Sequence, residues 1–281
     1  MQHRTSYFEG MDGIELYSQQ WLPEGPPRAI IAIVHGIGDH SGRYNNVIQP
    51  MVSNDYGVYG YDLRGHGKSP GQRGHINAWK EYRLDLLSFI QMIKGQQSGL
   101  PIFLLGHSMG ALIALDFMVS EREALAGAII SGAPIEPVGI AKPYLVALAH
   151  VLSRIYPKFS LDLGLDQDAI SRQPSVVKAY QDDPLVYGKV SARWGIESLR
   201  TVESVKGQAG NIAIPILMVH GEADRLNSEE GAKKFFDQIQ FQDKEFIGYV
   251  ESYHEVHNDL EYERMVRDIL DWLQRHIEEP S

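Results

Sequence analysis

The sequence predicts an α/β domain in which helices flank a mostly parallel central sheet and a helical cap is inserted. Two observations predict this class. Short apolar, β-branched runs alternate with longer helical patterns along most of the chain. The alternation breaks once, over residues 135–205, where prolines separate amphipathic segments. Because 281 residues suffice for one domain with an insertion, we expect a single domain over residues 1–281 with a cap at 135–205.

The strands and helices are expected in the following order. Residues 14–21 alternate in polarity, as antiparallel edge strands do. Buried parallel strands are expected at residues 30–34, 58–61, 102–105, 127–130, 216–219 and 245–250. Helices are expected at residues 81–94, 111–119 and 260–277. The cap shows no convincing strand, and we expect it to cover the carboxyl edge of the sheet, where ligands bind in open α/β folds.

Composition and charge narrow the class of protein. With 43% hydrophobic and 22% charged residues, the chain is typical of soluble globular proteins. No apolar run reaches the roughly 18 residues of a membrane span, and the first ten residues lack a secretory-signal pattern, so a cytoplasmic location is expected. The absence of cysteine excludes disulfides and a cysteine nucleophile. A net charge of −10 argues against a nucleic-acid partner.

A candidate nucleophile lies in the pentapeptide Gly106–Gly110, which has the pattern Gly-x-Ser-x-Gly. An expected strand ends just before it and an expected helix begins at about Met109. A strand, a sharp turn and a helix in this order form the nucleophile elbow of serine hydrolases, which projects the serine oxygen from the backbone. The sequence therefore predicts Ser108 as a nucleophile.

A serine nucleophile needs a base to take its proton and an acid to orient that base. The expected chain order is serine, acid, histidine. Asp224 follows the strand at residues 216–219, and Glu222 is its competitor. His254 follows the strand at residues 245–250, and His257 is its competitor. We favour Asp224 and His254.

The turn at residues 35–38 has two glycines and follows a buried strand. In this arrangement such a turn supplies one backbone amide to an oxyanion hole. We expect the amides of Ile37 and Met109 to be the donors, and His35 and Gly36 to lie against the substrate. Histidines elsewhere lack metal-ligand spacing, so no metal site is expected. Hydrolysis by a serine, an acid and a histidine needs no cofactor, and none is expected. Asp85 is assigned to the surface or to a helix cap.

The cap contains an apolar helix near residues 143–156. Leu145 and Leu148 belong to its apolar face, and both are candidate substrate contacts. Two interpretations stay open: the helix packs on an acyl pocket, or it lies in a lipid interface as a peripheral membrane contact. Residues 137–200 hold eight basic and six acidic residues, whereas the remainder of the chain carries a net −12. This asymmetry would turn the cap toward an anionic surface.

Taken together, these motifs resemble the monoacylglycerol lipase and lysophospholipase branch of the α/β-hydrolases. The matching segments are residues 35–44, 61–69, 106–110, 178–186, 220–224 and 253–257, within a resemblance that extends over residues 9–277. The resemblance implies Ser108, Asp224 and His254 as triad, with Ile37 and Met109 as oxyanion donors. Ile37 departs from the alanine often found in the family, and Ala111 from a glycine.

The function that these expectations favour is hydrolysis of a single-chain lipid ester, with monoacylglycerol preferred over lysophospholipid. A second interpretation is another carboxylesterase, a thioesterase or a peptidase that uses the same triad, because this triad serves many acyl-transfer substrates. A third is a non-catalytic binding protein of the same fold. The complete set of catalytic motifs argues against the third.

Overall fold

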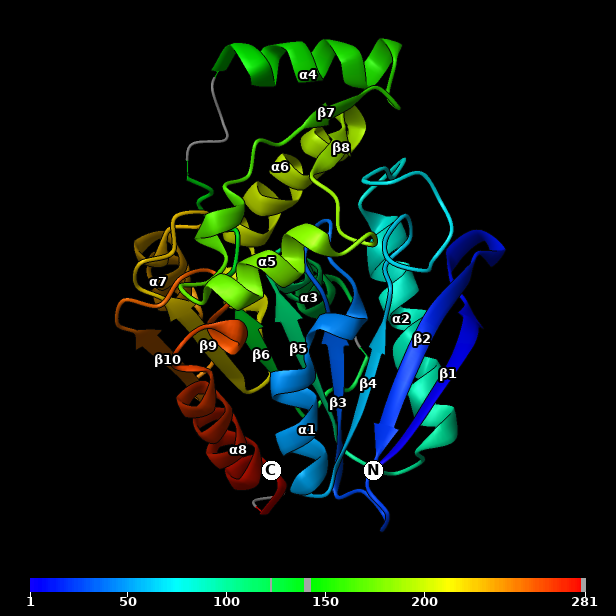
Figure 1. Ribbon diagram of the computed structural model, residues 1–281, viewed down its shortest axis with the longest axis vertical. Helices are drawn as coiled ribbons and strands as arrows, with labels where there is room; N and C mark the ends of the chain where they lie inside the picture. Colours follow the sequence, from blue (N-terminus) through cyan, green and yellow to red (C-terminus); the bar gives the residue numbers. More distant parts are fainter. Residues whose placement is uncertain (122, 139–142, 279–281) are drawn as a thin grey trace.

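The strands predicted as a parallel sheet form the centre of the computed structural model, which describes residues 1–121, 123–138 and 143–278, except the side chains of 143–145 and 278. The sheet has the strand order β1-β2-β4-β3-β5-β6-β9-β10 (Figure 1). Its strands are β1 (Gln2–Glu9), β2 (Glu15–Leu22), β3 (Ala29–Val34), β4 (Tyr56–Tyr61), β5 (Ile102–His107), β6 (Gly127–Ser131), β9 (Ile216–Gly221) and β10 (Lys244–Tyr249). The first two pair antiparallel at one edge, and the others run parallel. The predicted fold class is confirmed.

Helices cover both faces of this sheet. They are α1 (Asn45–Ser53), α2 (Lys80–Gln96), α3 (Met109–Ser120), α7 (Glu229–Gln238) and α8 (Tyr262–Glu278). Short 3₁₀ turns are η1 (Met11–Gly13), η2 (Ser41–Arg43), η3 (Gln167–Ala169), η4 (Ala209–Asn211) and η5 (Val256–Asn258). The sequence pattern predicts α2, α3 and α8 but misses α1 and α7. Both missed helices do bury an apolar side, Val47, Ile48, Met51 and Val52 in α1 and Ala232 and Phe235 in α7, so their patterns are compatible with the helices that the structure has.

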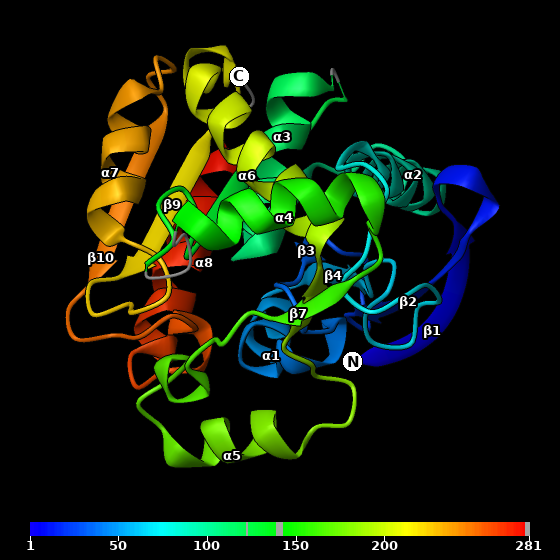
Figure 2. The same cartoon turned by 90° about the horizontal axis from the view of Figure 1, so that it is seen from above.

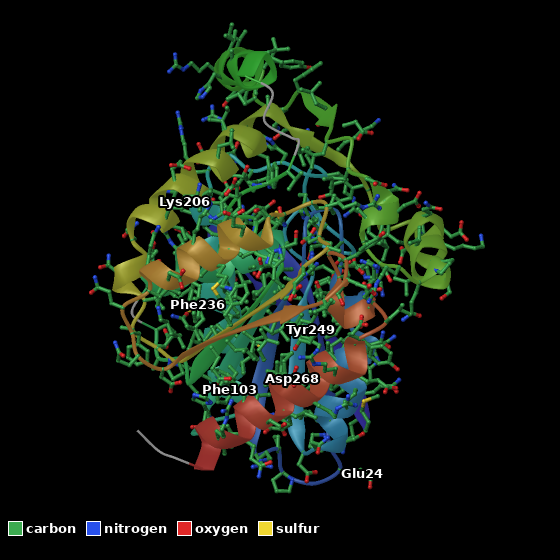
Figure 3. All side chains as sticks on the ribbon, turned by 90° about the vertical axis from the view of Figure 1, so that its left-hand side faces the viewer. Glu24, Phe103, Lys206, Phe236, Tyr249 and Asp268 are labelled. Carbon is green, nitrogen blue, oxygen red and sulfur yellow. The ribbon has the colours of Figure 1, made fainter. Side chains whose placement is uncertain are left out.

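The core has two layers, one on each face of the sheet, because successive strand residues point to opposite sides. In β3, Ile30 and Val34 pack with α2 and α3, whereas Ile31 and Ile33 pack with α1 and α8. Helix α8 packs against β5 at Phe103, whose ring lies 5.8 Å from that of Trp272. The hydroxyl of Tyr249 donates to Asp268 at 2.8 Å, which ties β10 to α8 (Figure 3).

The order in which successive strands are added to the sheet reverses at β3, since β4 pairs with it on one side and β5 on the other. Val34 lies opposite Gly106 in this register. The turn after β3 and the turn after β5 therefore lie side by side at the carboxyl edge, where ligands bind in open α/β sheets.

The segment between β6 and β9 forms the cap above this edge (Figure 1). It contains α4 (Pro143–Ile155), β7 (Ser160–Asp162), α5 (Pro174–Asp182), β8 (Lys189–Ser191) and α6 (Ala192–Gly207). The expectation of no strand here is wrong, since β7 and β8 pair antiparallel. Three-residue strands are too short to show an alternating pattern. Helix α4 lies across α6, well separated from α5 (Figure 2). Over the ranges described, no helix is long and apolar enough to cross a membrane.

Candidate active site

Ser108 occupies a strained turn between β5 and α3. Its backbone has φ 53° and ψ −121°, a region that non-glycine residues rarely adopt. Its amide donates to the carbonyl of Ser131 at 2.9 Å, and its own carbonyl accepts from the amide of Ala111 at 2.9 Å. A Cβ at Gly110 would collide with the carbonyl oxygen of Val34, so α3 can approach β3 only with glycine there. The surrounding structure thus holds the serine in a conformation that exposes its oxygen.

Asp224 and His254 meet through a short hydrogen bond. The Nδ1 of His254 lies 2.7 Å from an Asp224 carboxylate oxygen. Because a carboxylate accepts only, Nδ1 carries the hydrogen, and Nε2 keeps its lone pair. The second carboxylate oxygen accepts from the amides of Leu226 at 2.8 Å and Asn227 at 3.1 Å. The side chain of Asp224 is fully buried, whereas its sequence competitor Glu222 is exposed.

The contact between Asp224 and His254 favours the charged form of each side chain. Burial by itself raises the pKa of Asp224, but His254 and His220 outweigh it and hold that pKa far below its ordinary value. Burial by itself lowers the pKa of His254, but the Asp224 carboxylate outweighs it and raises that pKa above its ordinary value. His254 is therefore a stronger base than a free histidine.

His220 is a second histidine on Asp224 that sequence reasoning did not assign. Its Nε2 lies 3.2 Å from an Asp224 carboxylate oxygen and 3.1 Å from the carbonyl of Asn227. Both partners are acceptors, so Nε2 is the donor. The only signal in the sequence is its place at the end of β9, four residues before Asp224.

His257, the competitor of His254, has a different environment. Its ring stacks on that of Tyr44 with the centroids 4.8 Å apart and the planes within 6°. Burial lowers its pKa to about 4. The ring of His107 fills the space between the two, 4.8 Å from His254 and 4.7 Å from His257. The structure therefore joins His254, and not His257, to Asp224.

The turn at residues 35–38 lies beside Ser108. Gly36, Ile37 and Met109 all line the same cavity as Ser108. The amide of Met109 is at the start of α3, where helix amides have no partner within the helix. His35 differs from the expectation: it is fully buried and does not line the cavity. Its ring bonds to the carbonyl of Gly36 at 2.8 Å and accepts from the amide of Leu63 at 2.9 Å, so it holds two loops together.

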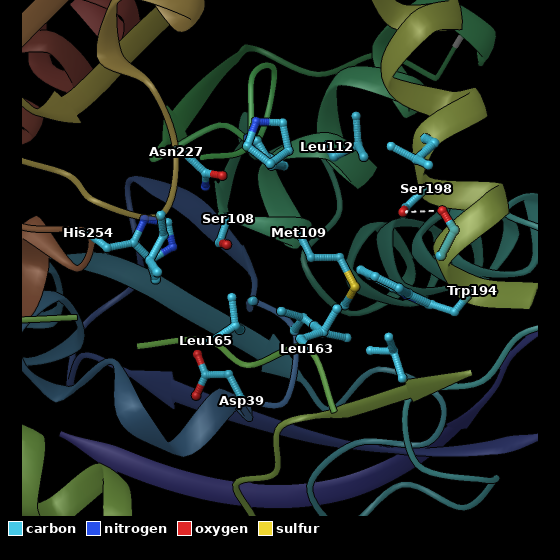
Figure 4. A pocket seen from close by; sticks show the side chains of 18 of the residues that line it. Asp39, Ser108, Met109, Leu112, Leu163, Leu165, Trp194, Ser198, Asn227 and His254 are labelled. Atoms are coloured by element: carbon cyan, nitrogen blue, oxygen red, sulfur yellow. Dashed lines mark hydrogen bonds between the residues drawn. The ribbon is translucent and has the colours of Figure 1, made fainter. Parts of the chain in front are cut away.

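A cavity of about 370 Å³ opens at Ser108 and runs beneath the cap. In Figure 4, His254 and Asn227 lie on one side of Ser108, and Met109, Leu112 and Trp194 lie on the other. Further apolar lining comes mostly from the cap: Val146, Leu161, Leu163, Leu165, Ile170, Val190, Leu199 and Val202. The cap also contributes the polar side chains of Asp162, Asp166 and Gln167. The cavity thus has a polar end at the serine, and its lining beneath the cap is mostly apolar.

Two carboxylates, Asp39 and Glu255, line the polar end. Arg43 donates to Asp39 at 3.0 Å and to both oxygens of Glu255 at 2.9 Å. The hydroxyl of Tyr44 also donates to Asp39, at 3.1 Å. Burial raises the pKa of Glu255, but Arg43 outweighs it and lowers that pKa to about 2. Arg43 also holds the pKa of Asp39 below its ordinary value, against the effect of burial. Both acids therefore stay ionised, and together with Arg43 they carry one net negative charge at this end of the cavity.

The cap helix α4 contributes residues to the cavity that the sequence did not predict. Val146 and Ala149 line the cavity. Leu148 does not; its side chain is 47% exposed, on the side of α4 turned away from the cavity. The expectation that Leu148 contacts substrate in the pocket is corrected, because the helix turns its 146/149 side inward. The side chain of Leu145 lies outside the described residues.

The side chains that the structure describes include no group of three histidines or carboxylates arranged to hold a metal ion. His40, for example, pairs with Asp183 of the cap at 3.0 Å. His75 bonds to the hydroxyl of Ser191 at 2.8 Å. Both histidines connect the cap to the core.

Comparisons with known proteins show what this chain is similar to. A family model described as serine aminopeptidase, S33, matches residues 25–261. A monoacylglycerol lipase of Mycolicibacterium smegmatis is 32% identical over 96% of each chain. Phospholipase YtpA of Bacillus subtilis is 34% identical over 84% of this chain and 92% of its own. The crystal structure of Paleococcus ferrophilus monoacylglycerol lipase superposes with a TM-score of 0.86 at 35% identity, covering 94% of this chain and all of that one.

Proposed function

Since the chain belongs to the serine aminopeptidase S33 family, in the monoacylglycerol lipase branch of the α/β-hydrolases, we propose that it hydrolyses monoacylglycerol to a fatty acid and glycerol. It is an ester hydrolase.

In the proposed mechanism, Ser108 attacks the ester carbonyl while Nε2 of His254 takes its proton. Asp224 holds the imidazole in the required tautomer and stabilises its charged form. The amides of Ile37 and Met109 stabilise the negative charge that develops on the carbonyl oxygen. Glycerol departs with the proton from His254, and an acyl group stays on Ser108. Water, deprotonated by His254, then releases the fatty acid.

The observation that carries the proposed substrate is the division of the cavity into a polar and an apolar end. The apolar end accommodates one acyl chain, and the ester then lies at Ser108. The alcohol is left beside Asp39 and Glu255, which are acceptors for glycerol hydroxyls. A neutral, hydroxyl-rich alcohol suits this end.

A lysophospholipid is the second candidate, because one relative is named a phospholipase. The net negative charge of Asp39, Glu255 and Arg43 disfavours a phosphate there. We therefore expect Asp39→Asn to raise the ratio of lysophospholipid to monoacylglycerol turnover.

The test is a panel of substrates offered to the wild type and to Ser108→Ala. It contains a long-chain monoacylglycerol, the lysophospholipid with the same chain, a soluble short-chain ester and an aminoacyl amide. The proposal expects the highest kcat/KM on monoacylglycerol, and a loss of roughly 10⁴-fold or more in the variant. A fluorophosphonate probe should label the wild type alone. Preference for the amide, or full activity in Ser108→Ala, would refute the proposal.

We further propose that the cap meets the lipid surface that holds this substrate. Leu148, Val151, Ile155 and Tyr156 are exposed by 47%, 53%, 77% and 62%. The basic side chains of Arg154 and Lys158, which lie on either side of Ile155 and Tyr156 in the sequence, are also exposed. An apolar strip flanked by cations is typical of a helix that lies in a membrane interface.

A further inference from the structure

The loop that carries His254 is joined to the base of the cap by backbone hydrogen bonds. We call residues 251–259 the histidine loop and residues 169–173 the cap root. The amide of His254 donates to the carbonyl of Ala169 at 3.3 Å, and that of Glu255 donates to Ile170 at 2.8 Å. In the opposite direction, the hydroxyl of Ser171 donates to the carbonyl of Asn258 at 2.9 Å. The two segments therefore lie against each other along most of their length.

The carboxylate of Asp259, which is fully buried, bonds to both segments. One of its oxygens accepts from the amides of Arg172 and Leu260, both at 2.9 Å. The other accepts from the Nε of Arg172 at 3.0 Å and from the amide of Tyr253 at 2.7 Å. Asp259 therefore holds the peptide next to His254 and the cap root at the same time.

Arg172 extends the contact to both ends of the histidine loop. Its guanidinium donates to the hydroxyl of Ser252 at 3.3 Å, pairs with Glu261 and lies 3.6 Å from Glu251. Only 16% of its side chain is exposed. A planar guanidinium can bind several acceptors in fixed directions, which lysine cannot do.

We propose that Arg172 and Asp259 are positioning residues that align His254 with Asp224. The inference rests on the proposed function, in which His254 is the base. The Nδ1–carboxylate distance of 2.7 Å depends on where the histidine loop lies relative to the loop after β9. The cap root restrains the histidine loop from the outer side, so this part of the cap belongs to the catalytic apparatus as well as to the pocket wall.

The other half of the cap has a different attachment. Helix α4 packs across α6, and Arg193 donates to the carbonyl of Ser153 at 2.7 Å, a bond inside the cap. Arg193 is partly buried, as Arg172 is. It is therefore a matched control, because the same substitution there removes a cap arginine without touching the histidine loop.

The test compares Arg172→Gln with Arg193→Gln on a soluble short-chain ester, which needs no lipid surface. Active enzyme is counted by fluorophosphonate titration, so that loss of folded protein does not enter kcat. We expect Arg172→Gln to lower kcat by roughly 10- to 100-fold with little change in KM, as misalignment of a reacting group does. Arg193→Gln should keep the wild-type kcat.

The pH profile separates positioning from a general loss of structure. In Arg172→Gln the carbonyls of Ala169 and Ile170 still cover His254, so its burial is retained while its bond to Asp224 weakens. The midpoint of the ascending limb in the kcat profile should therefore move to lower pH. The double variant Arg172→Gln/Asp259→Asn should lower kcat by no more than the two single-variant factors multiplied together.

Three outcomes are informative. If Arg172→Gln left kcat and the midpoint of the pH profile unchanged while the wild type was active, the positioning role of Arg172 would be overturned and the proposed function would not. Equal losses in Arg172→Gln and Arg193→Gln would do the same, because the effect would not be specific to the histidine loop. Full activity in Ser108→Ala or His254→Ala would instead overturn the proposed function.

Discussion

The exposed apolar side of α4 leads to a quantitative prediction for Ile155→Asp. Ile155 is 77% exposed at the end of α4, next to Tyr156. Burial of a whole isoleucine side chain contributes about 1.5–3 kcal/mol, so insertion of this exposed part into lipid contributes about 1–2 kcal/mol. Its loss corresponds to roughly 5- to 30-fold weaker partitioning into vesicles. The new carboxylate adds repulsion from an anionic surface.

The assay is co-sedimentation with vesicles that contain phosphatidylglycerol, together with turnover of long-chain monoacylglycerol in the same vesicles and of a soluble short-chain ester. Ile155→Asp should lower binding and vesicle turnover in parallel and leave the soluble ester unaffected. Tyr156→Asp and Tyr7→Asp form a matched pair, since the two tyrosines are 62% and 60% exposed and Tyr7 lies on β1, away from the cap. Equal effects of the tyrosine variants, or equal losses on both substrates, would refute the membrane contact.

Three further predictions concern the active site. The kcat on a soluble ester should rise with pH, with a midpoint above the ordinary histidine pKa of about 6.5, because Asp224 raises the pKa of His254. Only the neutral form of His254 accepts a proton. A constant kcat down to about pH 5 would contradict a histidine base. His254→Ala should lower kcat by roughly 10⁴-fold and His257→Ala far less, and the reverse ranking would exchange their roles. Arg43 lowers the pKa of Glu255 from 4.5 to about 2 in the folded state. The contribution of ionised Glu255 to the free energy of unfolding is therefore present above pH 4.5 and is lost as the pH falls toward about 2. Denaturation at a series of acid pH values should show a flatter decline for Glu255→Gln, and an identical decline would contradict this coupling.

The sequence by itself determines the elements whose signal is local. Gly106–Gly110 predicts a strained turn because its neighbours are a buried strand and a helix, and the structure has φ 53° at Ser108. The parallel strands are predictable for the same reason, since each is a short apolar run with turn residues at its ends. The edge strand β1 is not, because seven of its eight residues are exposed and show no apolar period.

The tertiary structure decides which polar groups meet. His254 and His257 lie three residues apart in similar sequence, and only the fold joins one to Asp224 and stacks the other on Tyr44. The sequence assigns Asp85 to the surface or a cap, yet its side chain is fully buried and bonds to Arg64 at 2.6 Å and 2.7 Å.

The same limit applies to the cap. Residues 169–173 and 251–259 are about eighty positions apart, so no local pattern predicts that Arg172 reaches Asp259. Periodicity shows that α4 has an apolar side, but only its packing on α6 decides that Val146 turns inward and Leu148 outward. Backbone conformation follows from neighbours along the chain, whereas hydrogen bonds between distant side chains depend on how the loops at the sheet edge converge.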